Sequence, residues 1–191
     1  MKKRIFVLAL LVLAAFLLVG CADGLDVPEP LEFTRGYWQD GVYTNVFANL
    51  TFRLPEGWAY TTREQLDAMT EMLRTSPTNP DPDSQQFFDM IAREASASVS
   101  IVIIFEPLSP EVSELPEDYL GGMRAVYQRR DGILYVSEFF DETFGGAEYA
   151  AFYVQFDSST SLTYFARRVG DYMLSISILR LELYDVLSYF S

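Results

Sequence analysis

The first apolar segment of the chain is a run of fifteen residues, Ile5 to Val19, that no charge interrupts. It follows three basic residues and leads into Gly20 and Cys21. As a helix it would be about 22 Å long, whereas the hydrocarbon core of a bilayer is about 30 Å thick. The run is therefore short for a membrane span. A basic start, an apolar middle and small residues before the cleavage point are typical of an export signal.

The tetrapeptide Leu18-Val19-Gly20-Cys21 resembles the lipobox of bacterial lipoproteins. The resemblance implies a signal peptide over 1–20, cleavage between Gly20 and Cys21, and a lipid (diacylglycerol and palmitate-type chains) on Cys21. Two or more acyl chains anchor a protein stably, at about 0.8 kcal/mol per buried methylene. We therefore expect an extracytoplasmic protein of the cell envelope, anchored to the cell membrane. By the same resemblance, Ala22 in place of aspartate after Cys21 argues against retention in the inner membrane of a host with two membranes. We favour a host with a single membrane. The alternative is an ordinary signal peptide followed by a chance cysteine.

After Cys21 the pattern of apolar positions is irregular up to residue 36, with two prolines and two glycines. We interpret residues 21–36 as a lipidated N-terminus and tether. A single domain is expected over 37–191. It opens with two short apolar and β-branched runs around Asp40-Gly41, a dipeptide that favours a tight β-hairpin. A strand over 47–54 follows, and Pro55 ends it.

Helical spacing begins in the next segment. Thr61 to Glu64 has the form of a capping box, and apolar residues recur at three- and four-residue intervals, so the sequence predicts a helix over 62–75. A short helix is predicted near 85–94. Ser98 to Glu106 is apolar on both faces in its second half, as in a strand at the middle of a sheet. Pro116 suits the first turn of a helix that ends near Arg129.

From Gly132 onward the apolar period becomes two. Four strands are predicted, and their short connections suit antiparallel neighbours; they span 133–143, 147–156, 162–169 and 172–179. A closing amphipathic helix is expected over 181–190. These elements predict an α+β fold, with one antiparallel sheet of about six to seven strands, a C-terminal four-strand meander and helices packed against the sheet.

The run Leu54-Pro55-Glu56-Gly57-Trp58 resembles the opening of small exported lipoproteins of Gram-positive type. Together with the predicted order of elements, it resembles the PsbP-like fold that the Ran-binding Mog proteins share. The resemblance covers nearly the whole mature domain. Because proteins with this fold have unrelated activities, it implies no catalytic residue.

Charge and composition narrow the chemistry. Removal of the three basic residues of the signal changes the formal charge from −13 to −16, so we expect no nucleic-acid partner. The chain has no histidine, its only cysteine is Cys21, and both lysines lie in the signal. This excludes His-based catalysis, thiolate or imidazole metal sites, Schiff bases and intramolecular disulfides. We expect no cofactor, no metal and no enzyme.

Three groups of carboxylates are candidate sites, and for each of them a solvated surface or a helix entry is the favoured explanation. Asp81, Asp83 and Asp89 have oxygen ligands suited to calcium, but the prolines between them break the EF-hand pattern. The second group lies at the entry to a predicted helix and consists of Glu111, Glu114, Glu117 and Asp118. The third group flanks the Gly145-Gly146 turn and consists of Glu138, Asp141, Glu142 and Glu148.

Aromatic residues make up 15% of the chain. Four of them lie close in sequence and are a candidate platform for sugar rings or a peptide, although packing in the core and the sheet is the favoured explanation; they are Tyr37, Trp38, Tyr43 and Trp58. The sequence favours a non-enzymatic binding or interaction module for an envelope protein or cell-wall ligand. The alternatives are a carboxylate-dependent cell-wall glycan hydrolase and a structural factor in envelope assembly.

Overall fold

The computed structural model describes residues 32–76, 85–96, 98–109, 115–181 and 185–191, which belong to one compact unit, Glu32–Ser191. The predicted tether is thus part of this unit from residue 32 onward. Among the described helices, none is both long and apolar enough to cross a membrane.

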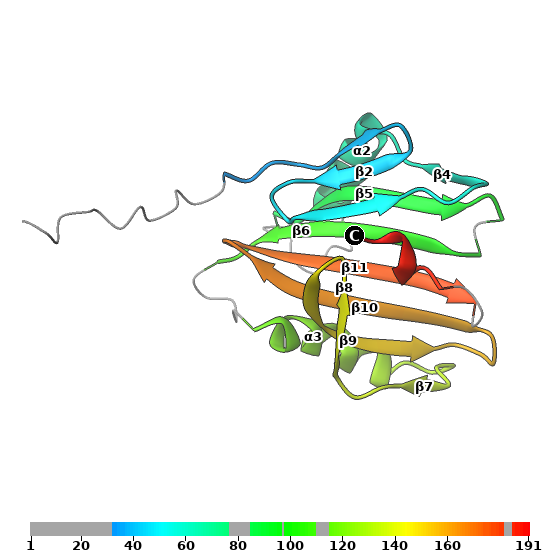
Figure 1. Cartoon of the computed structure of the whole chain (residues 1–191). Helices are drawn as coiled ribbons and strands as arrows, with labels where there is room; N and C mark the ends of the chain where they lie inside the picture. Colours follow the sequence, from blue (N-terminus) through cyan, green and yellow to red (C-terminus); the bar gives the residue numbers. More distant parts are fainter. Residues whose placement is uncertain (1–31, 77–84, 97, 110–114, 182–184) are drawn as a thin grey trace, which may run out of the picture. The chain divides into compact units, whose positions relative to one another are not determined.

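Eleven described strands form two sheets, and the class is α+β as predicted (Figure 1). The larger sheet is antiparallel, in the order β4-β5-β6-β11-β10-β9-β7, with β8 also paired to β9. Its strands are β4 (Trp58–Tyr60), β5 (Phe87–Glu94), β6 (Ser100–Pro107), β7 (Tyr135–Val136), β8 (Phe140–Phe144), β9 (Ala147–Gln155), β10 (Thr160–Val169) and β11 (Tyr172–Leu181). The smaller sheet consists of β1 (Tyr37–Gln39), β2 (Val42–Asn45) and β3 (Leu50–Arg53).

The prediction of a single sheet of six to seven strands is therefore wrong. The eight-stranded sheet stands apart from the three-stranded one because the free edge of β3 is taken by residues near the C-terminus. Phe52 bridges to Phe190, and the backbone groups of Thr51 and Ser191 exchange hydrogen bonds of 2.8 and 3.2 Å. With that edge occupied, the small sheet packs on the face of the large one instead of extending it.

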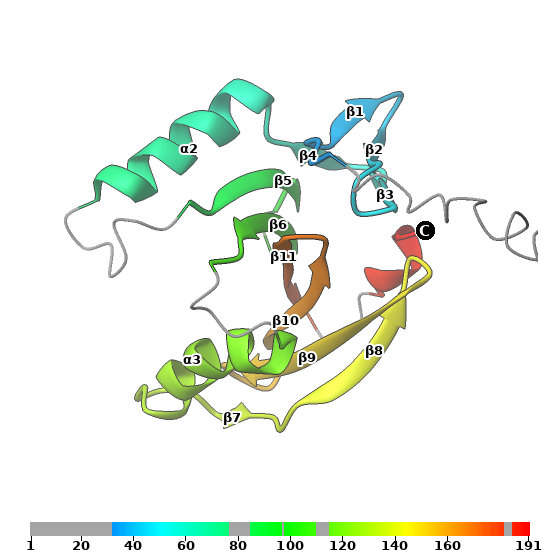
Figure 2. The same ribbon diagram turned by 90° about the vertical axis from the view of Figure 1, so that its left-hand side faces the viewer.

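The large sheet is covered on both faces. Figure 2 shows α2 (Arg63–Thr75) and α3 (Pro116–Gln128) on one side, and β1–β3 with the short 3-10 helix η1 (Leu187–Tyr189) on the other. Between the two sheets lies a core that includes Phe52, Ile103 and Ile176. A second core, under α3, contains Leu120 and Met173.

The predicted hairpin is confirmed, with Asp40 and Gly41 at φ values of 50° and 74° as a tight two-residue turn requires. Strand β6 lies between β5 and β11, which confirms a central strand there. The helix at Pro116 is confirmed to Gln128. The strand predicted over 47–54 is confirmed only for Leu50–Arg53.

The helix predicted over 62–75 is also confirmed, but its capping box lies one residue later than the predicted one. Thr62 accepts from the backbone N–H of Gln65, and the Gln65 side chain accepts from the backbone N–H of Thr62. Gln65, at the third helical position, thus has the capping role that the pattern predicts for Glu64.

The helix predicted near 85–94 is wrong, because this segment forms strand β5. Its apolar residues at 87, 88, 90 and 91 have helical spacing, but the cause is a β-bulge between Phe88 and Met90. The extra residue, Asp89, interrupts the two-residue alternation, so that Asp89 and Met90 are both buried.

Two differences concern the last third of the chain. The strand predicted over 133–143 is two strands, β7 and β8, the latter extending to Phe144. The helix predicted over 181–190 is wrong for the described residues of that range, where only the single 3-10 turn η1 occurs. Residues 182–184 lie outside the described residues.

Candidate functional site

The four aromatic residues of the candidate platform do not share one surface. Tyr43 and Trp58 are buried, with 0% and 8% of their surface exposed, and belong to the core between the sheets. Trp38 is half-buried and stacks on Tyr60 at 4.4 Å between ring centroids, while Tyr37 is exposed. Since Tyr37 and Trp38 are adjacent on β1, their side chains point to opposite faces of the strand.

The predicted acidic groups are dispersed. Asp81, Asp83, Glu111 and Glu114 lie outside the described residues. Glu117 and Asp118 occupy the first turn of α3. Around the Gly145-Gly146 turn, Glu138, Asp141 and Glu148 are exposed and Glu142 is half-buried. Among the residues that the structure describes, no cluster of three or more carboxylate, histidine or cysteine side chains could hold a metal ion.

Asp89 is the exception, because its side chain is fully buried. One carboxylate oxygen accepts from the Tyr43 hydroxyl at 2.5 Å, from the backbone N–H of Gly36 at 2.9 Å and from the Asn45 amide at 2.9 Å. The other faces two guanidinium groups at 3.3 Å, those of Arg35 and Arg63. A buried carboxylate with this many donors is compensated in both hydrogen bonding and charge.

Burial and the neighbouring Asp89 also change the pKa of Tyr43. Burial raises its pKa well above the ordinary value, and the negative charge of Asp89 and the hydrogen bond to it act in the same direction. Tyr43 therefore stays protonated and donates to Asp89 over the whole physiological range.

The short segment before β1 is held against β5 by this cluster. Arg35 uses all three guanidinium nitrogens: one donates to Asp89, one to Asp67 at 2.5 Å, and one to the backbone oxygen of Phe88. On the same stretch of β5, the N–H of Phe88 donates to the hydroxyl of Thr70 on α2 at 3.2 Å. The pairing of β4 reaches only as far as Ala92. Side chains thus cover backbone groups that a neighbouring strand leaves unpaired.

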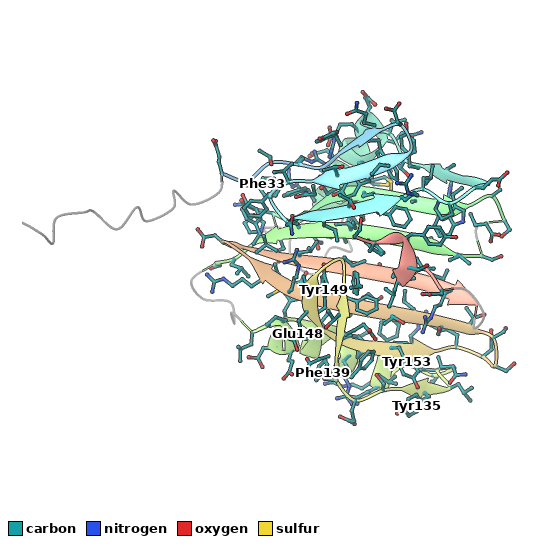
Figure 3. The ribbon with its side chains drawn as sticks, viewed as in Figure 1. Phe33, Tyr135, Phe139, Glu148, Tyr149 and Tyr153 are labelled. Carbon is teal, nitrogen blue, oxygen red and sulfur yellow. The ribbon has the colours of Figure 1, made fainter. Side chains whose placement is uncertain are left out.

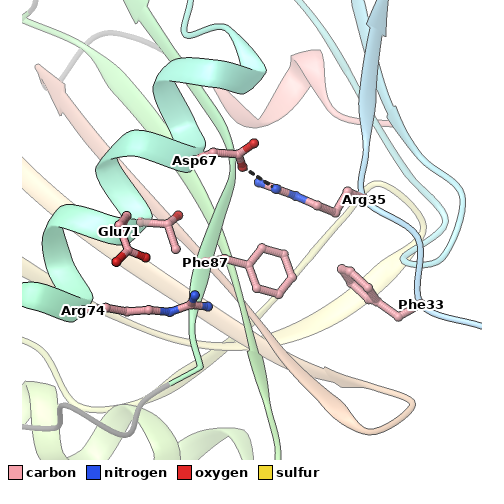
Figure 4. Close-up of a pocket in the computed structure, with 7 residues that line it drawn as sticks. Phe33, Arg35, Asp67, Glu71, Arg74 and Phe87 are labelled. Atoms are coloured by element: carbon pink, nitrogen blue, oxygen red, sulfur yellow. Dashed lines mark hydrogen bonds and ion pairs between the residues drawn. The ribbon is translucent and has the colours of Figure 1, made fainter.

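A pocket of about 450 Å³ opens between this segment, α2 and the start of β5 (Figure 4). Its volume lies within the range of about 300–1,000 Å³ common for small-molecule sites. Two half-buried phenylalanines provide apolar surface, and the other lining residues are polar or charged; the lining is Phe33, Arg35, Asp67, Thr70, Glu71, Arg74 and Phe87.

The two rings are fixed by their neighbours. Phe33 meets Phe87 edge to face at 5.3 Å and stacks on Tyr172 at 4.4 Å between centroids. The guanidinium of Arg35 lies 5.1 Å from the centre of the Phe87 ring, in cation–π contact. The apolar wall of the pocket is therefore formed before any ligand arrives.

A second exposed aromatic group lies elsewhere. Tyr135 on β7 and Tyr153 on β9 have their centroids 5.6 Å apart, and Tyr135 is 48% exposed. Figure 3 shows both at the β7–β9 edge, well away from Phe33. The pocket lined by Phe33 and Phe87 does not include this pair.

Sequence reasoning missed most of the site. The sequence makes Asp89 a candidate only as a cation ligand, whereas its charged partners are two arginines. Arg35 and Phe33 were assigned to the tether, and nothing in their spacing indicates contacts with residues more than 50 positions away. A possible signal was the acidic residue in the middle of an apolar run at 87–92, since a buried charge requires partners.

No family model and no curated protein matches the chain. Among solved structures, the solution structure of cyanobacterial PsbP (CyanoP) from Synechocystis sp. PCC 6803 is similar. The TM-score is 0.40 and the sequence identity 14%, and the match covers 85% of this chain and 98% of that one. A match at this TM-score and identity carries neither an activity nor a site residue over to this chain.

Proposed function

We propose that this chain is an exported lipoprotein, anchored to the cell membrane through Cys21, and that it acts as a non-enzymatic binding module. The pocket beside Asp89 is its ligand site. The main support for the binding role is the composition of this pocket, where a rigid aromatic surface lies next to charged side chains. The elements that form the pocket are held in place by the buried Asp89 cluster. The lipobox-like tetrapeptide at Leu18 to Cys21 supports the anchor.

The hydrolase alternative lacks comparable support. The pocket does contain two carboxylates, Asp67 and Glu71, one turn apart on α2. A general acid in a glycosidase needs a desolvated environment that keeps its proton. Asp67 is ion-paired to Arg35 with 54% of its side chain exposed, and Glu71 is exposed. Neither carboxylate is desolvated.

The anchor is tested by growing the host with an alkyne-labelled palmitate and comparing the wild-type chain with Cys21→Ser. We expect label on the wild type alone, and membrane association that is lost in the variant. Label on neither protein, or a variant that stays with the membrane, would contradict the lipoprotein assignment.

The binding role is tested separately in the anchored full chain, with a photo-crosslinking phenylalanine analogue at position 75. Thr75 is exposed and follows Glu71 by one helical turn, so it borders the pocket. The control position is Gln128, exposed at the end of α3. We expect adducts at 75 that Arg74→Gln abolishes, and none at 128. Equal adducts at both positions, or adducts that Arg74→Gln leaves unchanged, would rule out the pocket as the ligand site.

A further inference from the structure

The charged groups around the pocket largely neutralise one another. Asp89 is shared by Arg35 and Arg63, and Asp67 pairs with Arg35. The guanidinium of Arg63 also donates to the backbone oxygen of Gly36. Arg35 and Arg63 therefore have their charges compensated inside the protein, although Arg35 lines the pocket.

Two of the side chains that line the pocket remain available to a ligand. Within the part of the chain that the structure describes, the guanidinium of Arg74 and the carboxylate of Glu71 make no ion pair and no side-chain hydrogen bond. Figure 4 shows the Arg74 side chain extending from α2 toward Phe87 and Glu71 on the same helix, with no interaction drawn between them, and both residues line the pocket. One cation and one anion thus face the pocket beside its apolar wall.

This arrangement disfavours a simple ion as ligand. Over the six charged groups of the pocket and the Asp89 cluster, three arginines balance three carboxylates. A lone anion such as phosphate would gain from Arg74 and lose about as much to Glu71, and a lone cation would meet the reverse. A ligand gains from both only if it carries both charges.

We propose that the pocket binds a small zwitterion with an apolar side chain, that is, a free α-amino acid or a short peptide with both ends uncapped. This inference rests on the proposed function and specifies its ligand. The carboxylate of the ligand pairs with Arg74, its ammonium group pairs with Glu71, and its side chain packs on Phe33 and Phe87. A guanidinium binds a carboxylate through two parallel hydrogen bonds, which fixes the direction of the ligand in the pocket.

The proposed class of ligand is tested by measuring the binding of L-leucyl-L-leucine to the full chain by calorimetry. Its N-acetylated and C-amidated forms each lack one charge, and glycylglycine keeps both charges but lacks the apolar side chains. We expect each of these three to bind about tenfold or more weakly than the free dipeptide, the loss expected for one charge-assisted contact or one buried aliphatic side chain. Free leucine distinguishes an amino-acid site from a peptide site, and inorganic phosphate should not bind.

Variants of Arg74 and Glu71 test which residue binds each end of the ligand. Arg74→Gln should weaken the free dipeptide by about tenfold or more while leaving the C-amidated form unchanged, and Arg74→Lys should restore part of the loss. Glu71→Gln should weaken the free dipeptide and leave the N-acetylated form unchanged. The matched control is Arg130→Gln, an exposed arginine that follows α3.

The inference would be overturned if capping either end of the dipeptide had no effect, if phosphate bound as well as the dipeptide, or if Arg74→Gln weakened the free and amidated forms equally. Neither leucine nor the dipeptide binding, while Arg74-dependent adducts at position 75 persist, would reject the ligand class but leave the proposed function intact. Loss of those adducts as well would reject both.

Discussion

At the scale of single residues, Asp89 explains why so polar a cluster lies at the edge of an aromatic core. Its carboxylate gathers an N-terminal backbone amide, a tyrosine, an asparagine and two arginines. These partners come from three separate stretches of the chain: the segment before β1, strand β2 and the start of α2. Removal of one of them would leave a buried charge less compensated, which is costly, so the cluster constrains the position of each stretch.

Gly36 is the tightest point of this cluster. A Cβ atom there would lie 2.4 to 2.5 Å from the ring and hydroxyl of Tyr43, which itself is held by Asp89. Gly36→Ala should therefore destabilise the fold by about 1–3 kcal/mol, as overpacking of a buried site does. The matched control is Gly122→Ala in α3, where a Cβ meets nothing within 4 Å. Because alanine favours helix, that variant should gain about 0.5–1 kcal/mol.

Urea denaturation of both variants measures the free energies of unfolding. Equal effects of the two replacements would contradict the close packing of Gly36 against Tyr43.

At the scale of secondary-structure elements, the sequence predicted what local chemistry determines. The Asp40-Gly41 turn, the start of α3 at Pro116 and the central strand β6 each depend on a few adjacent residues. Strand β5 depends on a bulge that aims Asp89 at distant partners, and only those partners make the buried charge tolerable. The three-stranded sheet likewise depends on pairing between Phe52 and Phe190. Long-range contacts of this kind produce no periodic pattern of apolar residues in the sequence, so they could not be predicted from it.

The turn between β9 and β10 is an element whose stability depends on pH. Asp157 accepts hydrogen bonds from the backbone of Ser159 and Thr160 and from the Ser159 hydroxyl, and the first of these contributes most to lowering its pKa from 3.8 to about 2. A carboxyl group with a lowered pKa in the folded state stabilises the fold above its unfolded pKa, and this stabilisation is lost as the pH falls through the folded value.

Asp157→Asn should consequently lower the Tm above about pH 4, and the difference from the wild type should shrink as the pH approaches about 2. Thermal melts followed by circular dichroism across this range measure it. Asp141→Asn, which changes an exposed residue of β8, is the control. A difference between Asp157→Asn and the wild type that is the same at every pH would argue against an ionised Asp157 in the turn.

At the scale of the whole molecule, the proposed anchor and the charge of the mature chain have opposite effects on membrane binding. The acyl chains on Cys21 would supply about 0.8 kcal/mol per buried methylene, whereas a formal charge of −16 repels anionic head groups. The lipidated full chain, purified from its host, should therefore float with neutral phosphatidylcholine vesicles at any salt concentration. Its binding to vesicles rich in phosphatidylglycerol should be weaker at low salt and recover as salt shortens the range of the repulsion to about 8 Å and below. Cys21→Ser should float with neither kind of vesicle. If that variant bound anionic vesicles as well as the wild type does, the protein would hold the membrane through its folded surface, and neither the lipid nor the charge would have the role assigned to it.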